Sequence, residues 1–555
     1  MKKILTFGLL SLLITTACGK SDLPQPDQSK TFPTFETFIE WCQNQESLSP
    51  DAKHTVEVLL KEAETQECDR AQESLSKLTE LRIRGDEIKD IAPLAGLTNL
   101  EVLTLYINKI EDIAPLAGLT NLKGLDLNSN QIEDITPLAG LTNLEWLDLS
   151  DNKKIKDLAP LASLTNLTHL DLDNGYGLEG KIKDIGPLAN LTNLKFLAIG
   201  ANQIEDVAPL TNLTNLEVLW LDKNKIGEVA SFASLTKLTQ LHLSGNQIED
   251  VAPLANLTNL KSLWLSGNQI KDVAPLASLT KLTVLNLYQN QIKDIAPLAN
   301  LTQLTSLQLS NNEIKDVAPL ASLTNLTEDL DLRYNEIKDV APLASLTQLT
   351  SLQLSNNEIK DVAPLASLTN LTEDLDLRDN QIKDVAPLAS LTQLKNLQLS
   401  HNEIKDVAPL ASLTNLTEHL HLSNNEIKDV APLASLTQLK HLHLSNNEIK
   451  DVAPLVNLTE LTSLELSDNQ IKDVAPLANL TQLTFLQLSN NEIKDVAPLA
   501  NLTQLEHLHL SNNEIKDIAR LPNLTDMVNF SVDGNPIDPR FCLFNLNICS
   551  PLGLR

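Results

Sequence analysis

Residues 293–314 read KDIAPLANLTQLTSLQLSNNEI, and this 22-residue pattern recurs from Leu78 almost to the end of the chain. Each copy has two leucines separated by one residue, an Asn three positions after the second leucine, and a following DxxPLxxLT segment. The Asn recurs from Asn108 to Asn535, and with one turn counted through an insertion near residue 175 there are 21 copies. A fixed period of this length indicates a solenoid of stacked coils, not the three or four globular domains that 555 residues would otherwise suggest.

The chemistry of one copy predicts one coil. Alternation in LxL is typical of a short strand with its leucines inward and its flanking residues in solvent, so stacked copies form a parallel sheet. The Asn amide can both donate and accept at a buried corner. In the next segment, Asp272 is expected at a helix N-cap and Pro275 in the first turn of a short helix on the convex side.

The pattern LxxLxLxxNxI marks a leucine-rich repeat, and the appended DIxPLxxLT resembles the 22-residue internalin type of bacteria. The resemblance spans about 460 of the 555 residues. It implies an α/β solenoid, a leucine-rich-repeat horseshoe with a parallel concave β-sheet, and protein recognition by that curved sheet. An immunoglobulin-like segment and an LPxTG sorting signal are not found after the repeats, so host invasion is not implied.

Both ends of the repeat are expected to carry caps, because the outer coils of a solenoid would otherwise expose their apolar edges. Phe35, Phe38 and Cys42 have helical spacing, and Ser49 followed by Pro50 opens a second helical pattern. The predicted segments are a signal peptide (1–17), a lipid-anchored tether (18–31), a helical N-terminal cap (32–74), a solenoid of about 21 coils (75–535) and a short C-terminal cap (536–555).

The first residues resemble a bacterial lipoprotein signal. Two lysines precede a short apolar run that ends in TTAC, so Cys18 is expected to be lipidated; the alternative is an ordinary cleaved signal with a stray Cys. By the same resemblance, Gly19 permits transfer to the outer membrane or cell surface. With Cys18 assigned, the other four of the five cysteines fall into one pair near each end of the fold. The predicted disulfides are Cys42 with Cys68 and Cys542 with Cys549.

Composition restricts the partners. The 43 Lys and Arg against 72 Asp and Glu give a net charge of −29, which disfavours nucleic acid and acidic lipid surfaces. No combination of nucleophile, base and orienting group is recognisable, so neither catalysis nor a cofactor is expected.

Aromatic residues mark one part of the concave face. Trp220, His242 and Trp264 occupy the same strand position in three successive coils. Adjacent strands lie about 4.8 Å apart, so these rings are predicted to form a contiguous stripe, and exposed Trp and Tyr are typical of protein interfaces. Incidental exposure is the alternative. This predicted aromatic stripe comprises Tyr106, Trp146, Phe196, Trp220, His242, Trp264 and Tyr288.

Four histidines form a second cluster farther along the sheet. They are His419, His421, His441 and His443, two on each of two neighbouring strands. Imidazoles one ladder step apart could share a zinc or copper ion or respond to pH, but duplication of HLHL explains them equally well. We therefore expect no metal site, with these four as the candidates if there is one.

The sequence favours an exported, lipid-anchored module that binds a protein with its concave face. Two alternatives stay open: a rigid envelope spacer without one specific face, and a regulatory subunit similar to the repeat proteins that dock on protein phosphatases. Export argues against the second alternative.

Overall fold

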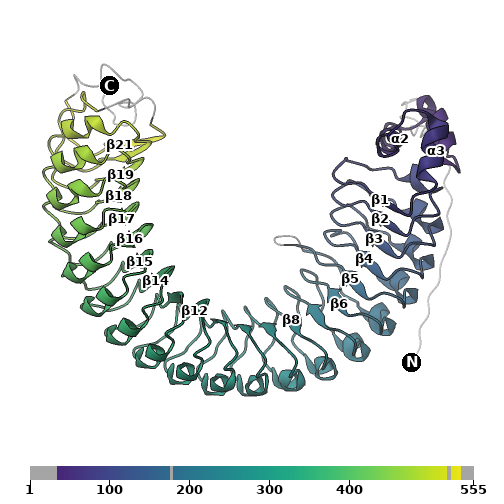
Figure 1. The fold of residues 1–555 in the computed structure, drawn as a ribbon, viewed down its shortest axis with the longest axis horizontal. Coiled ribbons are helices and arrows are strands. Elements are labelled where there is room, and N and C mark those ends of the chain that lie inside the picture. The colour runs from purple at the N-terminus through teal and green to yellow at the C-terminus, as the bar shows by residue number, and fades with distance from the viewer. Residues whose placement is uncertain (1–33, 176–178, 522–526, 539–555) are drawn as a thin grey trace, which may run out of the picture.

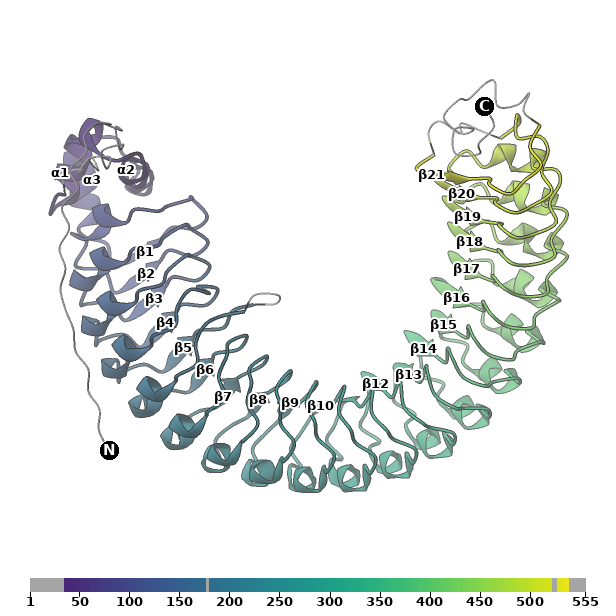
Figure 2. The same ribbon diagram turned by 180° about the vertical axis from the view of Figure 1, so that it is seen from behind.

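The computed structural model describes residues 34–175, 179–521 and 527–538. In these residues the chain forms one solenoid curved into a horseshoe, with strands on the inner side and short helices on the outer side (Figures 1 and 2). The N-terminal helices cover one end of the arc. The fold predicted from the repeat is confirmed.

A parallel sheet of 21 three-residue strands lines the concave side of the described solenoid. Each strand pairs with its neighbours in sequence, and equivalent positions of successive coils are in register, as Leu219 with Leu241 and Leu241 with Leu263. The strands are β1 Glu80–Arg82, β2 Val102–Thr104, β3 Gly124–Asp126, β4 Trp146–Asp148, β5 His169–Asp171, β6 Phe196–Ala198, β7 Val218–Trp220, β8 Gln240–His242, β9 Ser262–Trp264, β10 Val284–Asn286, β11 Ser306–Gln308, β12 Asp329–Asp331, β13 Ser351–Gln353, β14 Asp374–Asp376, β15 Asn396–Gln398, β16 His419–His421, β17 His441–His443, β18 Ser463–Glu465, β19 Phe485–Gln487, β20 His507–His509 and β21 Asn529–Ser531.

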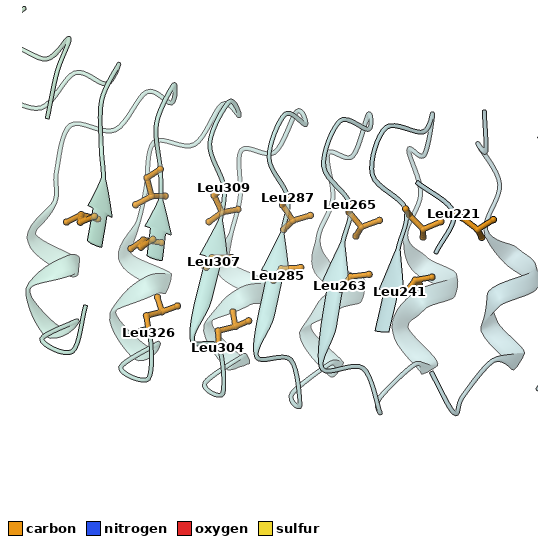
Figure 3. Packing of buried hydrophobic residues seen from close by; sticks show 14 of the residues in the cluster. Leu221, Leu241, Leu263, Leu265, Leu285, Leu287, Leu304, Leu307, Leu309 and Leu326 are labelled. Carbon is orange, nitrogen blue, oxygen red and sulfur yellow. The ribbon is translucent and has the colours of Figure 1, made fainter. Parts of the chain in front are cut away.

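The leucines of LxL form one continuous core along the solenoid. Leu241 and Leu243 are fully buried, as are their counterparts in nearly every coil. Figure 3 shows Leu263 and Leu265, then Leu285 and Leu287, repeating the same orientation from strand to strand. Stacking therefore buries an apolar row that a single coil would leave exposed, which is why the fold needs several consecutive copies.

The Asn of each repeat closes the corner that follows the strand. Asn246 donates from Nδ2 to the carbonyls of Leu221 and Leu243, both at 3.0 Å, and its Oδ1 accepts from the amide of Ile226 at 3.0 Å. One side chain thus satisfies backbone groups of two coils that would otherwise be buried without partners. The structural role predicted for the Asn series is confirmed.

In the described residues, the convex side carries one short 3-10 helix between each two successive strands from β1 to β20. The helices are η2 Ala92–Leu94, η3 Ala114–Gly118, η4 Thr136–Gly140, η5 Ala159–Ser163, η6 Gly186–Asn190, η7 Ala208–Asn212, η8 Ala230–Ser234, η9 Ala252–Asn256, η10 Ala274–Ser278, η11 Ala296–Asn300, η12 Ala318–Ser322, η13 Ala341–Ser345, η14 Ala363–Ser367, η15 Ala386–Ser390, η16 Ala408–Ser412, η17 Ala431–Ser435, η18 Ala453–Asn457, η19 Ala475–Asn479 and η20 Ala497–Asn501. The prediction that Asp272 is the N-cap was wrong by one residue: Val273 is at that position. The Asp272 carboxylate still accepts from the amide of Ala274 at 2.8 Å, as an Asx turn rather than as a cap.

Three α-helices and one further 3-10 helix cover the first coil. They are α1 Phe38–Gln43, η1 Gln45–Ser47, α2 Pro50–Glu62 and α3 Cys68–Leu75. Ser49 caps α2 as predicted, accepting from the amide of Ala52 at 3.0 Å. Thr55 on α2 donates to the carbonyl of Asp90 at 2.6 Å, which fastens the cap to the first coil.

The predicted disulfide between Cys42 and Cys68 is present and joins α1 to the start of α3. The second predicted pair, Cys542 with Cys549, lies outside the described residues, as do Cys18 and the predicted signal peptide. No helix in the described ranges has the length and apolarity that crossing a membrane requires.

Candidate functional site on the concave face

Five aromatic rings on five successive strands touch one another in sequence. The ring centroids are 6.0 Å apart for His169 and Phe196, 5.2 Å for Phe196 and Trp220, 5.3 Å for Trp220 and His242, and 5.2 Å for His242 and Trp264. These separations are within the range of favourable aromatic pairs. We call His169, Phe196, Trp220, His242 and Trp264 the ring series.

Mutual contact leaves the ring series only partly exposed. Trp264 is 37% exposed at one end, whereas Phe196, Trp220 and His242 are half-buried between their neighbours. The buried Nε1 of Trp220 has no hydrogen-bond partner, while Nε1 of Trp264 donates to Ser262 Oγ at 3.0 Å. The rings therefore pack against one another as an apolar surface. Within this surface the Trp220 Nε1–H donates to no group of the chain.

The remaining members of the aromatic stripe lie apart from the ring series or at its edge. Trp146, 37% exposed on β4, is in register with His169. Tyr288, 41% exposed, follows β10 beyond Trp264. Tyr106 lies near the N-terminal end of the sheet, where Arg84 stacks over its ring at 5.0 Å. Proximity along one face is confirmed for Phe196, Trp220, His242 and Trp264, but Tyr106 belongs to a separate contact.

A cavity of about 450 Å³ opens beside the ring series, just past the carboxyl ends of the strands. Its lining comes from six successive coils. The lining residues are Asp173, Gly175, Ala201, Asp222, Lys223, His242, Ser244, Gly245, Trp264, Ser266, Gly267, Tyr288 and Gln289.

Small residues create this cavity. Gly245 and Gly267 occupy the position before the repeated Asn, with φ of +69° and +65°. Asn311 and Asn356 adopt φ of 57° and 56° at the same position, so the backbone alone does not demand glycine. A Cβ at Gly245 would lie 3.3 Å from Lys223 Cγ. Because Gly245 and Gly267 have no side chains, the cavity stays open at a position that longer side chains occupy in later coils.

Carboxylates gather on one side of the cavity. Burial raises the pKa of Asp173, and repulsion from Asp222 and then Asp151 raises it further. Burial likewise raises the pKa of Asp222, although the amide of Ser244 donates to its Oδ1 at 2.7 Å. At the end of β5, two residues before Asp173, burial raises the pKa of Asp171 to about 7.

The histidine of the cavity is uncharged at neutral pH. Burial lowers the pKa of His242 to about 4. Its Nδ1 lies 3.7 Å from Asp222 Oδ2, but a neutral ring forms no ion pair at that distance. His242 therefore contributes to the aromatic wall and does not neutralise the carboxylates.

The four-histidine cluster consists of two stacked pairs. The ring centroids of His419 and His441 are 4.3 Å apart, and those of His421 and His443 are 4.1 Å apart. Burial, then the charge of neighbouring histidines, lowers the pKa of His421 to about 4 and that of His443 to about 3. The part of the chain that the structure describes contains no set of three or more His, Cys, Asp or Glu arranged to hold a metal ion. Parallel stacking explains this, because it prevents the ring nitrogens from converging on one point.

Between these two regions, the concave face satisfies its own charges. Asp376 is fully buried and accepts from Nε and Nη2 of Arg378 at 2.9 and 2.8 Å. Asp331 and Arg333 make the same paired contact on β12. Groups already paired within the chain have little to gain from a ligand, so the cavity beside the ring series is the stronger candidate site.

Sequence reasoning missed several residues of this site. His169 extends the ring series, and the signal was available in its strand sequence HLD, one coil before Phe196. The repeat pattern does not single out Asp173 or Asp222. Gly245 and Gly267 stand out only as SGN where later coils have SNN.

Stacked 22-residue coils with an inner parallel sheet and an Asn ladder define a leucine-rich-repeat solenoid of the kind that commonly binds protein partners. The family model described as "Leucine Rich repeats (2 copies)" matches residues 76–118, 98–140, 142–176, 214–256, 258–300, 302–345, 347–390, 392–435, 418–457, 437–479, 459–501 and 481–524. This chain belongs to the leucine-rich-repeat family. A search of curated proteins gives no match.

Solved structures agree with this assignment. The chain is 40% identical to an internalin, inlF, from Listeria monocytogenes, over 54% of this chain and 88% of that one, with a TM-score of 0.52. The ectodomain of a plant receptor kinase from Arabidopsis thaliana is 22% identical, over 84% and 72% of the two chains, with a TM-score of 0.58. A leucine-rich-repeat protein from Leptospira interrogans is 22% identical, over 76% and 97%, with a TM-score of 0.52. The first supports an internalin-like repeat, and the other two show the fold alone.

Proposed function

We propose that this chain is a non-enzymatic recognition module that binds a protein partner on its concave face, with the ring series at the centre of the contact. The observation that carries the proposal is the row of touching rings from His169 to Trp264, which presents apolar surface beside an open cavity. Tryptophan and tyrosine are the residues that most often dominate binding energy at protein interfaces.

The size of the sheet argues for a local site. Strands about 4.8 Å apart give 21 coils an inner surface on the order of 100 Å long, more than a standard interface of about 800 Å² per partner requires. One globular ligand can therefore use only part of the face. The region from β5 to β10 combines the ring series and the cavity, whereas β12 to β15 carries carboxylates already paired with arginines.

The test uses alanine variants of the full-length protein once a partner has been captured and identified. Trp220→Ala combined with Trp264→Ala should weaken binding at least tenfold, because buried tryptophans commonly contribute about 2 kcal/mol or more each. Gln308→Ala combined with Gln353→Ala alters two polar positions on β11 and β13 and should change affinity by less than about twofold. The reverse ranking would show that the aromatic surface is incidental.

The proposal extends to location: an exported protein held at a membrane by a lipid on Cys18, at the outer membrane or cell surface. The Cys42–Cys68 disulfide supports an oxidising compartment outside the cytoplasm. Cys18→Ala should move the protein from the membrane fraction to the soluble fraction. Cys42 and Cys68 are unchanged in this variant, so the presence of their disulfide serves as the control for folding. Unchanged membrane association would refute the lipid anchor but not the recognition site.

A further inference from the structure

The cavity beside the ring series has a chemical character that specifies its ligand more closely. We propose that it binds the cationic side chain of a lysine or arginine, carried by an extended segment of the partner protein. This inference rests on the proposed function and assigns the chemistry of one contact within it. The lining residues of the cavity belong to the coils of β5 to β10, whose strands lie on the inner curve of the horseshoe (Figure 2).

The cavity has room for a long, thin side chain. Its volume of about 450 Å³ falls in the range of sites that hold small ligands. The room comes from Ala201, Gly245 and Gly267, which occupy the position where later coils carry Asn or a longer residue. Gly200 is needed as well, since a Cβ there would lie 2.5 Å from Asp173 Oδ2 and would displace that carboxylate from the cavity.

Charge selects a cation. The lining contains the carboxylates of Asp173 and Asp222 and one ammonium group, that of Lys223, while His242 is neutral. Asp151, in the coil before Asp173, adds a third carboxylate close enough to repel it. One oxygen of Asp151, its buried Oδ1, has no hydrogen-bond partner. The charge of Lys223 offsets part of this repulsion, because it lowers the pKa of both Asp173 and Asp222. It is one cation among three carboxylates, so a ligand cation would relieve the remaining repulsion, whereas an anion would increase it.

The lining from the coils of β9 and β10 suits the same ligand. Trp264 and Tyr288 line the cavity, and the hydrogen bond from Trp264 Nε1 to Ser262 fixes the indole in place. The face of a tryptophan ring attracts an ammonium or guanidinium within about 6 Å, and the methylene stem of lysine or arginine packs against apolar surface. Aromatic rings and carboxylates that line one cavity thus match a long cationic side chain at its stem and at its head.

The direct test compares three blocked pentapeptides that differ only at their centre: Ser-Gly-Lys-Gly-Ser, its arginine counterpart and its norleucine counterpart. Norleucine keeps the apolar stem and removes the charge. Tryptophan fluorescence of the full-length protein, titrated at constant salt, should show binding of the first two peptides at least tenfold tighter than the third. Equal affinity for norleucine, or no binding of either cationic peptide, would overturn the inference.

A matched pair of variants separates the cavity from the general negative field of the protein. Asp173→Asn with Asp222→Asn should reduce binding of the lysine peptide at least tenfold. Asp329→Asn with Asp374→Asn removes two half-buried carboxylates from the same concave sheet, on β12 and β14, and changes the net charge equally. This control should stay within twofold of the parent, and equal losses in both pairs would show that only the overall field attracts the peptide.

Lys223 supplies an independent arm. Gln289 occupies the equivalent position three coils later, with φ of 56° against 54° for Lys223, so Lys223→Gln introduces a residue that this backbone conformation already accepts. Removing the ammonium should at least double the affinity for the lysine peptide, and a loss of affinity would contradict the proposed polarity of the cavity. If the aspartate pair leaves affinity for the captured partner unchanged while the tryptophan pair abolishes it, the cation site fails and the proposed function stands.

Discussion

At the scale of single residues, the repeat separates positions that hold the fold from positions free to vary. Asn246 satisfies three backbone groups inside the coil stack, so its identity is dictated by buried hydrogen bonds. The position flanked by the two leucines faces the concave side, and it carries Trp at Trp220, His at His242 and Gln at Gln308. Recognition can therefore evolve on the inner face without disturbing the core.

The stacked histidines give the C-terminal half a predicted dependence on pH. An unfolded histidine titrates near 6.5, whereas burial lowers the pKa of His421 to about 4 and that of His443 to about 3. Below about pH 6.5 the unfolded state therefore binds more protons, and stability is lost as the pH falls. Glu465, whose Oε2 lies 3.6 Å from His443 Nδ1, and Arg378 on the other side also face this pair.

Replacing both histidines with glutamine, the residue at Gln398 and Gln487 in the same register, should flatten this dependence. Between pH 7 and pH 5 we expect the parent to lose about 1–2 kcal/mol more than His421→Gln with His443→Gln, after discounting for partial solvent exposure. Native-state hydrogen exchange of the β16 and β17 amides measures the difference. His401→Asn, an exposed change to the residue found at Asn311, is the control; a parent-like pH profile in the double variant would contradict the prediction.

At the scale of elements, the strands and the first cap follow from local sequence, but finer features do not. LxL predicts each strand because alternation and burial coincide in three residues. The sequence predicts the Asp of each convex turn as the N-cap, whereas the N-cap is the next residue, as Val273 after Asp272. The Asp instead forms an Asx turn, and the sequence pattern alone does not distinguish these two roles. Helix α3 was not anticipated, because only Ala71 and Leu75 of its eight residues are buried and so its periodicity is weak.

The candidate site was predictable only in part for a related reason. Trp220, His242 and Trp264 share one repeat position, so a comparison of coils reveals them. The cavity depends on the absence of side chains at Gly245 and Gly267 and on the position of the Asp173 carboxylate close to Gly200. Such features arise between coils and are not visible in any single copy of the repeat.

At the scale of the whole molecule, each coil contacts mainly the coils on either side, so the horseshoe can be shortened without opening its core. Residues 306–333 and 351–378 have identical sequences. Deleting residues 323–367 removes β12 and β13 and joins Ser322 to Leu368. The new contact between β11 and β14 then repeats, residue for residue, the existing contact between β13 and β14.

This deletion distinguishes a local recognition site from a partner that spans both arms of the horseshoe (Figure 1). The ring series and the cavity lie wholly before residue 290, so the shortened protein should bind the captured partner within about twofold of the parent, as judged by surface plasmon resonance. Deleting residues 214–257 is the matched control, since it also removes two whole coils in register, but these carry Trp220 and His242, and binding should fall at least tenfold. A tenfold loss in the first deletion would instead place essential contacts on the C-terminal arm, because removing two coils there alters both its surface and its distance from the ring series.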